Sequence, residues 1–295
     1  DLAPTYPPRF RLKAQFVSSL IAQCFGYERT QLPGRYTAIS DIDRKCHEIT
    51  EKYAGKTIEE ISVLLGCPIE GNGSKNVTEQ LIVKMFGGSS GKLNNIELFC
   101  RFGVIAKTVV VTPSGGRTED MKLFHVDFNS WMCEEDFADS EINGYLLDSH
   151  FLCILFEEPA AEYTIDPASG KRKKVKQPLK RNRFLGFKRF VVADEMIETK
   201  AKLLWDDTRT KIREHTLVDV PTIRGGKRMM LSNGEPSSAP NWMKSVENPI
   251  FIRGSAIKAT SEYKTETVNG IRMLPQYVWL SGTYLTKKLR ETDML

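Results

Sequence analysis

In the first third of the chain, apolar residues recur at the three- and four-residue spacing of amphipathic helices. The clearest case is the set Ile42, Cys46, Ile49 and Tyr53, which follows Asp41 as a helix cap and precedes Gly55 as a stop. Further on, a Thr-x-x-Glu capping box opens another helical stretch. We therefore expect helices over residues 14–26, 41–55, 57–66 and 77–88, the last with Leu81, Ile82, Met85 and Phe86 on one side.

The period then shortens to that of β-strands. Strands are expected over residues 102–111 and 121–128, joined by a turn-rich loop, and over 183–192. The continuous apolar run His150–Glu158 is typical of a strand buried on both faces. Residues 194–215 form a long amphipathic pattern that places Ile197, Ala201, Leu204, Thr208 and Ile212 on one face.

Strands and a short helix are expected in the closing segments 248–260 and 274–289. The whole pattern predicts a mixed α/β domain over residues 41–295, preceded by a linker and helical segment over residues 1–40. The helices 57–66 and 77–88 also suggest a helix-turn-helix motif. Ten residues separate them, however, whereas that motif uses a turn of about three or four.

Composition is ordinary for a globular protein, with 41% hydrophobic and 27% charged residues. No apolar run is long enough to span a bilayer, and the N-terminus lacks a signal-peptide pattern. We therefore expect a cytoplasmic protein without a membrane partner. The chain begins at Asp1 without an initiator Met, which suggests a fragment or a processed product.

The six cysteines are scattered, and none forms the close pairs that zinc sites use. Reduced thiols and no zinc are the expectation.

The net charge is only +5, but the basic residues cluster in two segments. Residues 170–183 hold eight basic residues and no acid, and residues 224–228 repeat the pattern. Such segments either are solvated loops or neutralise phosphates. The candidates for phosphate contact are Lys171, Arg172, Lys173, Lys174, Arg224, Lys227 and Arg228.

One strand raises a question of metal chemistry. Many Mg²⁺-dependent nucleases place Glu-x-Lys on one strand, so that both side chains point the same way toward a metal that an upstream Asp also binds. Lys107 occupies the Lys position of such a strand, but Ile105 stands two positions before it, where the nucleases have Glu. Glu97 is the only acid in the preceding segment 96–102.

Residues 86–124, which include "GVIAKT", resemble the MutH-like endonuclease family, whose strand reads Gly-Val-Glu-Leu-Lys-Thr. The resemblance continues in "LLWDDTRTKI", "FIRGSAIKA" and "VWLSGTYLTKKL". It is closest to the C-terminal domain of Sau-type restriction endonucleases that cut GATC, and it covers the chain from about Phe10 onward. It implies a restriction-endonuclease-type fold with a central mixed sheet flanked by helices.

Carried over position by position, the family's Glu falls on Ile105 and its Lys on Lys107. Its Asp falls on Leu98, or on Glu97 with a different gap, and a further Glu falls on Val83. Hydrocarbon side chains cannot coordinate Mg²⁺. The resemblance therefore implies no catalytic or metal-binding residue in this chain, with Mg²⁺ needed only by the catalytic domain of the parent enzyme. Lys107 keeps either a phosphate contact or no role.

For DNA contact, the resemblance matches Arg253 with a family Arg that bonds base edges, as Arg does with guanine O6 and N7. Gly254 and Ser255 stand where the family has Pro and Lys, and Lys258 is a candidate phosphate ligand. Trp279 matches a family aromatic and suits either DNA contact or core packing. Trp205 is interpreted as a core residue. Asp206 and Asp207 point about 100° apart on a helix and so do not converge on one metal ion; they are interpreted as solvated or capping residues.

The resemblance thus implies an allosteric DNA-binding domain of a type II restriction endonuclease. Its partners would be duplex DNA containing GATC and an N-terminal nuclease domain of the same protein. Two alternatives stay open. One is an active Mg²⁺-dependent endonuclease with displaced acids, Glu97 with Glu119 or Asp120. The other is a protein-interaction scaffold.

Overall fold

The structure is a computed structural model of the 295-residue chain. It describes residues 16–17, 20–21, 24–26, 29–89, 92–93, 96–116, 119–165, 170, 172–175, 177–231 and 233–295. The chain divides into two compact units, each built from segments distant in sequence. Unit 1 comprises residues 1–114, 148–190 and 293–295, and unit 2 comprises residues 115–147 and 191–292. The boundary expected between residues 40 and 41 stays a prediction.

Most helices in the described part of unit 1 follow the apolar spacing of the sequence. They are α2 (Ile39–Tyr53), α3 (Ile58–Leu64), α4 (Lys75–Met85) and the short α5 (Glu97–Phe102), which no pattern predicted. The four residues expected on the inner face of α2 are its buried residues. The capping box of α3 is confirmed, because Thr57 accepts from the Glu60 backbone N–H and the Glu60 carboxylate accepts from Thr57 N. Of the helix expected over residues 14–26, part lies outside the described residues.

The cap of α2 differs from the expected one. The helix begins at Ile39, so Asp41 lies inside its first turn rather than before it. From there its carboxylate accepts hydrogen bonds from the backbone N–H groups of Thr37 and Ala38 at 2.7 and 3.0 Å. Asp41 therefore still satisfies the free N–H groups at the helix start, from the third helical position.

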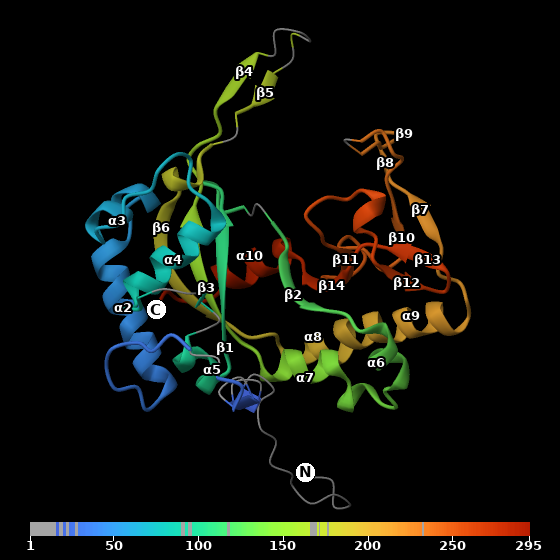
Figure 1. The fold of residues 1–295 in the computed structure, drawn as a ribbon, viewed down its shortest axis with the longest axis horizontal. Coiled ribbons are helices and arrows are strands. Elements are labelled where there is room, and N and C mark those ends of the chain that lie inside the picture. Colours follow the sequence, from blue (N-terminus) through green and yellow to red (C-terminus); the bar gives the residue numbers. More distant parts are fainter. Residues whose placement is uncertain are drawn as a thin grey trace, which may run out of the picture. The chain divides into compact units, whose positions relative to one another are not determined.

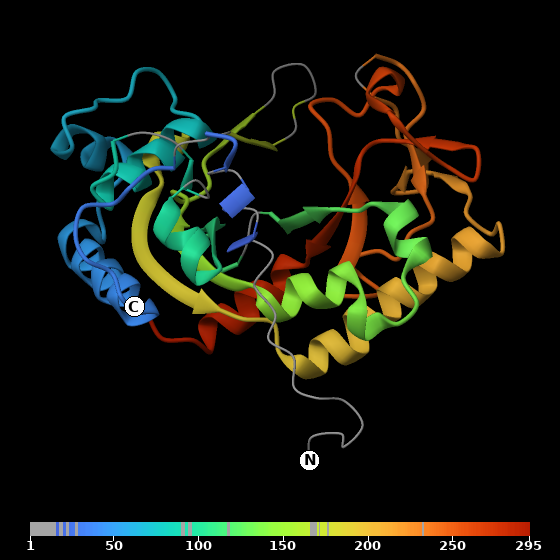
Figure 2. The same ribbon diagram turned by 60° about the horizontal axis from the view of Figure 1, so that its bottom comes forward.

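The sheet of unit 1 has three strands, β1 (Val104–Val111), β3 (His150–Glu157) and β6 (Arg183–Phe190), in the order β1-β3-β6. β1 runs parallel to β3, and β6 runs antiparallel to it. The central place of β3 explains its unbroken apolar run, because both of its faces and both of its edges are covered. Helix α2 lies along β6 (Figure 2).

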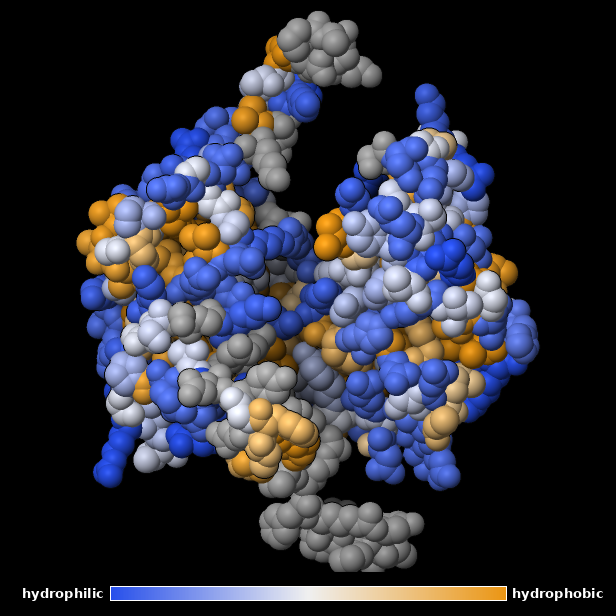
Figure 3. Space-filling view, viewed as in Figure 1, coloured by the Kyte–Doolittle hydropathy of each residue, from blue (hydrophilic) through white to orange (hydrophobic). Residues whose placement is uncertain are grey.

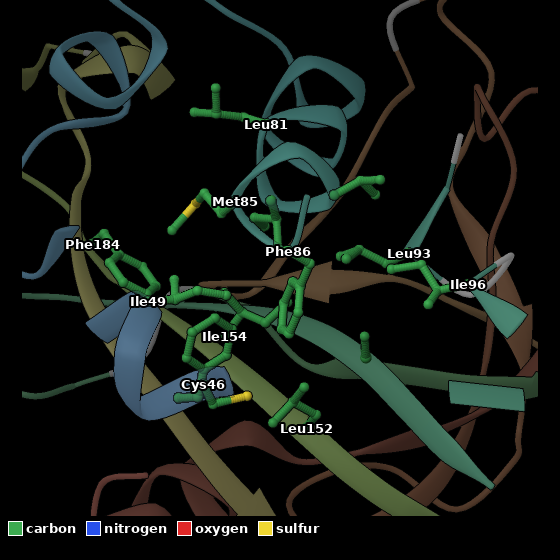
Figure 4. Packing of buried hydrophobic residues seen from close by; sticks show 14 of the residues in the cluster. Cys46, Ile49, Leu81, Met85, Phe86, Leu93, Ile96, Leu152, Ile154 and Phe184 are labelled. Atoms are coloured by element: carbon green, nitrogen blue, oxygen red, sulfur yellow. The ribbon is translucent and has the colours of Figure 1, made fainter. Parts of the chain in front are cut away.

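The core of unit 1 forms where the helices meet this sheet (Figure 4). Phe86 packs edge-on against Phe99 and Phe187, with ring centroids 5.4 and 5.5 Å apart. Cys46 of α2 and Leu152 of β3 fill the same cluster.

The basic segment predicted as a loop contains a hairpin. β4 (Tyr163–Ile165) and β5 (Arg172–Lys174) pair antiparallel (Figure 1), and a 3-10 turn, η3 (Leu179–Arg181), leads into β6. Basic composition hid the strand pattern, because strongly charged residues are not favoured in strands.

Helices of unit 2 include α6 (Phe128–Cys133), the 3-10 turn η2 (Phe137–Asp139), α7 (Glu141–Asp148) and α10 (Gly282–Arg290). The long helix expected over residues 194–215 is present as α8 (Asp194–Met196), the π-helical turn η4 (Ile197–Ala201) and α9 (Lys202–Arg213). The wider π-turn leaves the Lys200 carbonyl to accept a bond from the buried side chain of Asn248 at 2.8 Å. Helix α6 packs against α9.

The main sheet of unit 2 has the order β11-β14-β2, with all pairs antiparallel. Its strands are β2 (Met121–His125), β11 (Ile250–Gly254) and β14 (Gln276–Leu280). The loop that follows β1 therefore connects strands of two different sheets.

Three small ribbons complete unit 2 (Figure 1). They are β7 (Asp219–Pro221) with β10 (Ser238–Pro240), β8 (Ile223–Arg224) with β9 (Lys227–Arg228), and β12 (Glu266–Val268) with β13 (Ile271–Met273). A 3-10 turn, η5 (Ser261–Tyr263), precedes β12. Gly225 and Gly226, with φ of 56° and 74°, form the tight turn of the β8–β9 hairpin, which requires left-handed backbone at both positions.

The prediction of a mixed α/β fold is confirmed, with its strands divided among several small sheets. Among the described residues, no helix combines the length and the apolar character needed to cross a membrane.

Candidate nucleic-acid interface

Six side chains share one face of the β11-β14-β2 sheet. Paired residues of antiparallel strands point the same way, so Phe251, Trp279 and Lys122 form one row, and Arg253, Tyr277 and His125 form the next. The opposite face carries Ile250, Ile252, Val278 and Leu280, which are all buried, whereas Phe251 is the one buried residue of the six on the first face. We call the first six residues the cationic–aromatic face.

A β-bulge brings Lys122 and His125 to the same side. The two residues are three positions apart and would point to opposite faces of a regular strand. The register shifts between Tyr277 and Trp279, so that Trp279 pairs with Lys122 and Tyr277 pairs with His125. Such bulges re-aim side chains.

Arg253 is held from two sides on this face. Its guanidinium carbon lies 4.0 Å from the centre of the Trp279 ring, and its Nη1 lies 2.7 Å from Asp120 Oδ2. The Trp279 Nε1–H in turn donates to the backbone oxygen of Arg253 at 2.9 Å. The side chain is nevertheless 45% exposed, so the guanidinium is fixed in place and open to solvent.

Lys122 is fixed in a similar way. Its Nζ lies 3.9 Å from the centre of the Tyr277 ring and 3.4 Å from Ser255 Oγ. His125 meets the same tyrosine ring edge-on and pairs with the carboxylate of Glu266. Aromatic rings thus hold both cations of the face through cation–π contacts.

Gly254 accounts for one departure from the family pattern. A Cβ at this position would lie 2.9 Å from the Leu274 Cβ and 3.1 Å from the Gln276 Nε2. Close packing against Leu274 therefore favours glycine here. The next residue, Ser255, is half-buried, and its N–H donates to the Pro275 carbonyl at 2.9 Å.

The candidate phosphate ligands are spread over both units. Arg224, Lys227 and Arg228 are exposed on the β8–β9 hairpin of unit 2, in a region where hydrophilic residues dominate the surface (Figure 3). Lys258, also in unit 2, is exposed and lines a shallow pocket with Glu235, Thr260 and Ser261.

Unit 1 carries the other candidates. On the β4–β5 hairpin, Lys173 is exposed and Arg172 stacks 3.9 Å above the Tyr163 ring. Lys174 belongs to β5, whereas Lys171 lies outside the described residues.

Lys107, half-buried on β1, pairs with Cys153 of β3. Complete burial raises the pKa of Cys153 to about 12, and the nearby Lys107 ammonium opposes this rise only weakly. Cys153 is therefore an inert thiol at neutral pH, and β3 offers no thiolate nucleophile beside Lys107. All six cysteines are free, as expected.

The positions matched to the nuclease carboxylates lie in the core of unit 1. Leu98 and Ile105 are each 4% exposed, and Val83 is fully buried. Glu97 is the first residue of α5 and is half-buried. The other displaced acids considered, Glu119 and Asp120, both belong to unit 2, where Glu119 is exposed and Asp120 is engaged by Arg253.

Metal-ligand clusters are absent from the described part of the chain, where no three His, Cys, Asp or Glu side chains converge. Asp206 and Asp207 instead form ion pairs along α9 with Lys202 and Lys211, at 2.6 and 2.7 Å.

The two tryptophans differ. Trp205 is 4% exposed and is a core residue, as predicted. Trp279 is half-buried on the cationic–aromatic face, where Arg253 covers its ring.

Sequence reasoning singled out Arg253 and Trp279 but not Lys122 or Tyr277, and it considered Asp120 only as a displaced catalytic acid. The alternation in "QYVWL" was a usable signal, because it places Tyr277 and Trp279 on one face of a strand. Lys122 and Asp120 had no local signal, since their role depends on the pairing of β2 with β14.

Comparison with protein-family models finds no matching family, and comparison with curated proteins finds no similar sequence.

Proposed function

We propose that this chain binds double-stranded DNA through the cationic–aromatic face of unit 2, with Arg253 in contact with a base edge. The observation that carries the proposal is the fixed, exposed guanidinium of Arg253 between Trp279 and Asp120. A guanidinium held in one orientation loses little entropy when it forms two parallel hydrogen bonds to guanine.

The face suits a duplex better than a single strand. Proteins that bind single strands stack bases on open aromatic rings. Here Arg253 lies over Trp279 and Lys122 lies over Tyr277, so each ring already has a cation above it. The face therefore presents its cations, rather than its aromatic rings, to a bound nucleic acid.

Phosphate contacts would come from the exposed basic hairpins. Arg224, Lys227 and Arg228 flank a two-glycine turn that keeps the tip of the β8–β9 hairpin narrow. Phosphate contacts of this kind give affinity without choice of sequence.

The finer proposal follows the family resemblance. The chain is proposed to be a non-catalytic, MutH-like domain that recognises GATC and favours the active state of an N-terminal nuclease domain. Such allosteric coupling requires that DNA bind with different affinity to the active and the inactive state of the protein. The buried hydrocarbon of Leu98, Ile105 and Val83 supports the non-catalytic part of the proposal.

Fluorescence anisotropy on a GATC duplex and on a scrambled duplex of the same composition, at matched salt, tests the proposal. We expect both to bind at low salt and the GATC duplex to bind more tightly. Equal affinities for the two duplexes would contradict sequence-specific recognition. Absence of binding to either duplex at low salt would remove DNA binding altogether and would favour a protein-interaction scaffold.

A nicking assay tests the nuclease alternative. The chain is incubated in large excess with supercoiled plasmid that contains GATC, with Mg²⁺ and with EDTA. We expect no Mg²⁺-dependent conversion to the nicked form. Nicking that disappears on Glu97→Gln would show that the displaced acids catalyse.

A further inference from the structure

The loop that follows β11 is fixed at both ends. At its start, the Ser255 N–H donates to the Pro275 carbonyl, and Ser255 Oγ accepts from Lys122 Nζ. At its end, Thr260 is only 6% exposed, and both the N–H and the hydroxyl of Ser261 bond to Glu235, at 3.0 and 2.8 Å. Those bonds also lower the pKa of Glu235, so the anchor is charged at neutral pH.

The middle of the loop is open to solvent. Residues 256–259 are all exposed, and Ile257 is 90% exposed. An anchored loop therefore presents a large aliphatic side chain to water, where it contributes nothing to the core. Lys258 is its neighbour, and Arg253 lies four positions before it on β11.

This arrangement limits the chemistry of a partner. Arg253 and Lys258 favour an anionic surface, and Ile257 would bury apolar area against an apolar group within that surface. On the base edges of duplex DNA the apolar group is the 5-methyl of thymine, which lies in the major groove. An apolar side chain that instead wedges between base steps enters from the minor groove and does not read this methyl.

We propose that Ile257 contacts the 5-methyl group of a thymine while Arg253 contacts a base edge of the same site. The inference rests on the proposed binding of duplex DNA and adds a second specificity-determining residue to it. It assigns Ile257 to readout and leaves Lys258 as a phosphate ligand.

The test removes each partner of the contact in turn. Wild type and Ile257→Ala are titrated by anisotropy against a GATC duplex and against the same duplex with uracil in place of thymine. Uracil lacks only the methyl group. Wild type should bind the thymine duplex about fourfold more tightly, the ratio that corresponds to about 0.8 kcal/mol for one buried methylene-sized group. Ile257→Ala should bind both duplexes equally.

Val246→Ala is the matched control, because Val246 is also an aliphatic side chain of unit 2 that is 90% exposed. It should keep the wild-type ratio. Both variants should keep the wild-type thermal midpoint, since neither side chain is packed.

The outcomes separate the inference from the proposed function. If wild type binds the two duplexes equally, or if Ile257→Ala keeps the thymine preference, the methyl contact is wrong although DNA binding stands. If Ile257→Ala weakens both duplexes by the same factor, Ile257 acts as a wedge and the proposal is overturned. If wild type binds no duplex at low salt, the proposed function fails together with the inference.

Discussion

Arg253 and Trp279 hold each other on neighbouring strands. The indole ring supports the guanidinium at 4.0 Å, and the indole N–H bonds to the carbonyl of the same arginine at 2.9 Å. Trp279 thus supports both the side chain and the backbone of Arg253, and the guanidinium in turn covers the Trp279 ring. This mutual support makes the face a candidate for sequence readout rather than a general basic surface.

Removal of the indole should therefore weaken readout. Trp279→Phe keeps a ring under Arg253 but loses the hydrogen bond, which costs about 1 kcal/mol of unfolding free energy. Trp279→Leu also loses the cation–π contact, worth about 0.5–1 kcal/mol at an exposed site. Urea unfolding should rank the stabilities as wild type, Phe variant, Leu variant, and anisotropy should rank GATC preference in the same order. A Leu variant with full GATC preference would show that Trp279 does not position Arg253.

Asp120 balances Arg253 and should limit its contribution to affinity. Asp120→Asn removes a negative charge from the face, so affinity for every duplex should rise. The slope of log affinity against log salt should steepen by about one. The same carboxylate accepts the Gly282 N–H at the start of α10, at 3.3 Å, and asparagine retains an acceptor there. A fall in duplex affinity for a folded Asp120→Asn would contradict the placement of DNA at this face.

Basic residues of the two hairpins should affect affinity without affecting choice of sequence. Lys173→Ala and Lys227→Ala should each weaken GATC and scrambled duplexes by similar factors and reduce the salt slope by about one. Lys200→Ala is a control of equal charge change, because Lys200 is an exposed lysine on η4 and belongs to neither hairpin. A change in the GATC-to-scrambled ratio for Lys173→Ala or Lys227→Ala would assign that lysine to base readout instead.

Asp41 should give unit 1 an acid-sensitive stability. Hydrogen bonds from the backbone N–H groups of Thr37 and Ala38 lower its pKa from 3.8 to about 2. A carboxyl whose folded pKa is depressed stabilises the fold above its unfolded pKa, and this contribution is lost as pH falls toward the folded value. Wild type should therefore lose stability between about pH 4 and pH 2 more steeply than Asp41→Asn. Urea midpoints at several pH values in this window measure the difference, and parallel curves for the two proteins would contradict it.

Local patterns predicted most of the helices and the central strand. The inner face of α2 and the buried run of β3 follow from apolar spacing alone, because each element packs against the core with a fixed period. The pairing of strands did not follow. β1 and β2 are adjacent in sequence yet belong to different sheets, and β14, with which β2 pairs, comes from the end of the chain.

The same limit applied to the candidate interface. Arg253 was found because a short motif surrounds it, but its ion-pair partner Asp120 lies 133 positions earlier in the chain. Lys122 reaches the face only through a bulge opposite Tyr277 and Trp279. Contacts of this kind depend on the tertiary pairing of distant strands, which no local period encodes.

The central claim is that Arg253 reads DNA sequence, and the most direct test is the ratio of GATC to scrambled affinity for wild type and Arg253→Ala at one salt concentration. Loss of a bidentate base contact should lower the discrimination by about 1–3 kcal/mol, while affinity for the scrambled duplex changes much less. A control variant, Arg44→Ala, removes an exposed arginine of unit 1 and should leave the ratio as it is. If Arg253→Ala binds GATC with the preference of wild type, Arg253 does not read the bases and the assignment of this face is wrong.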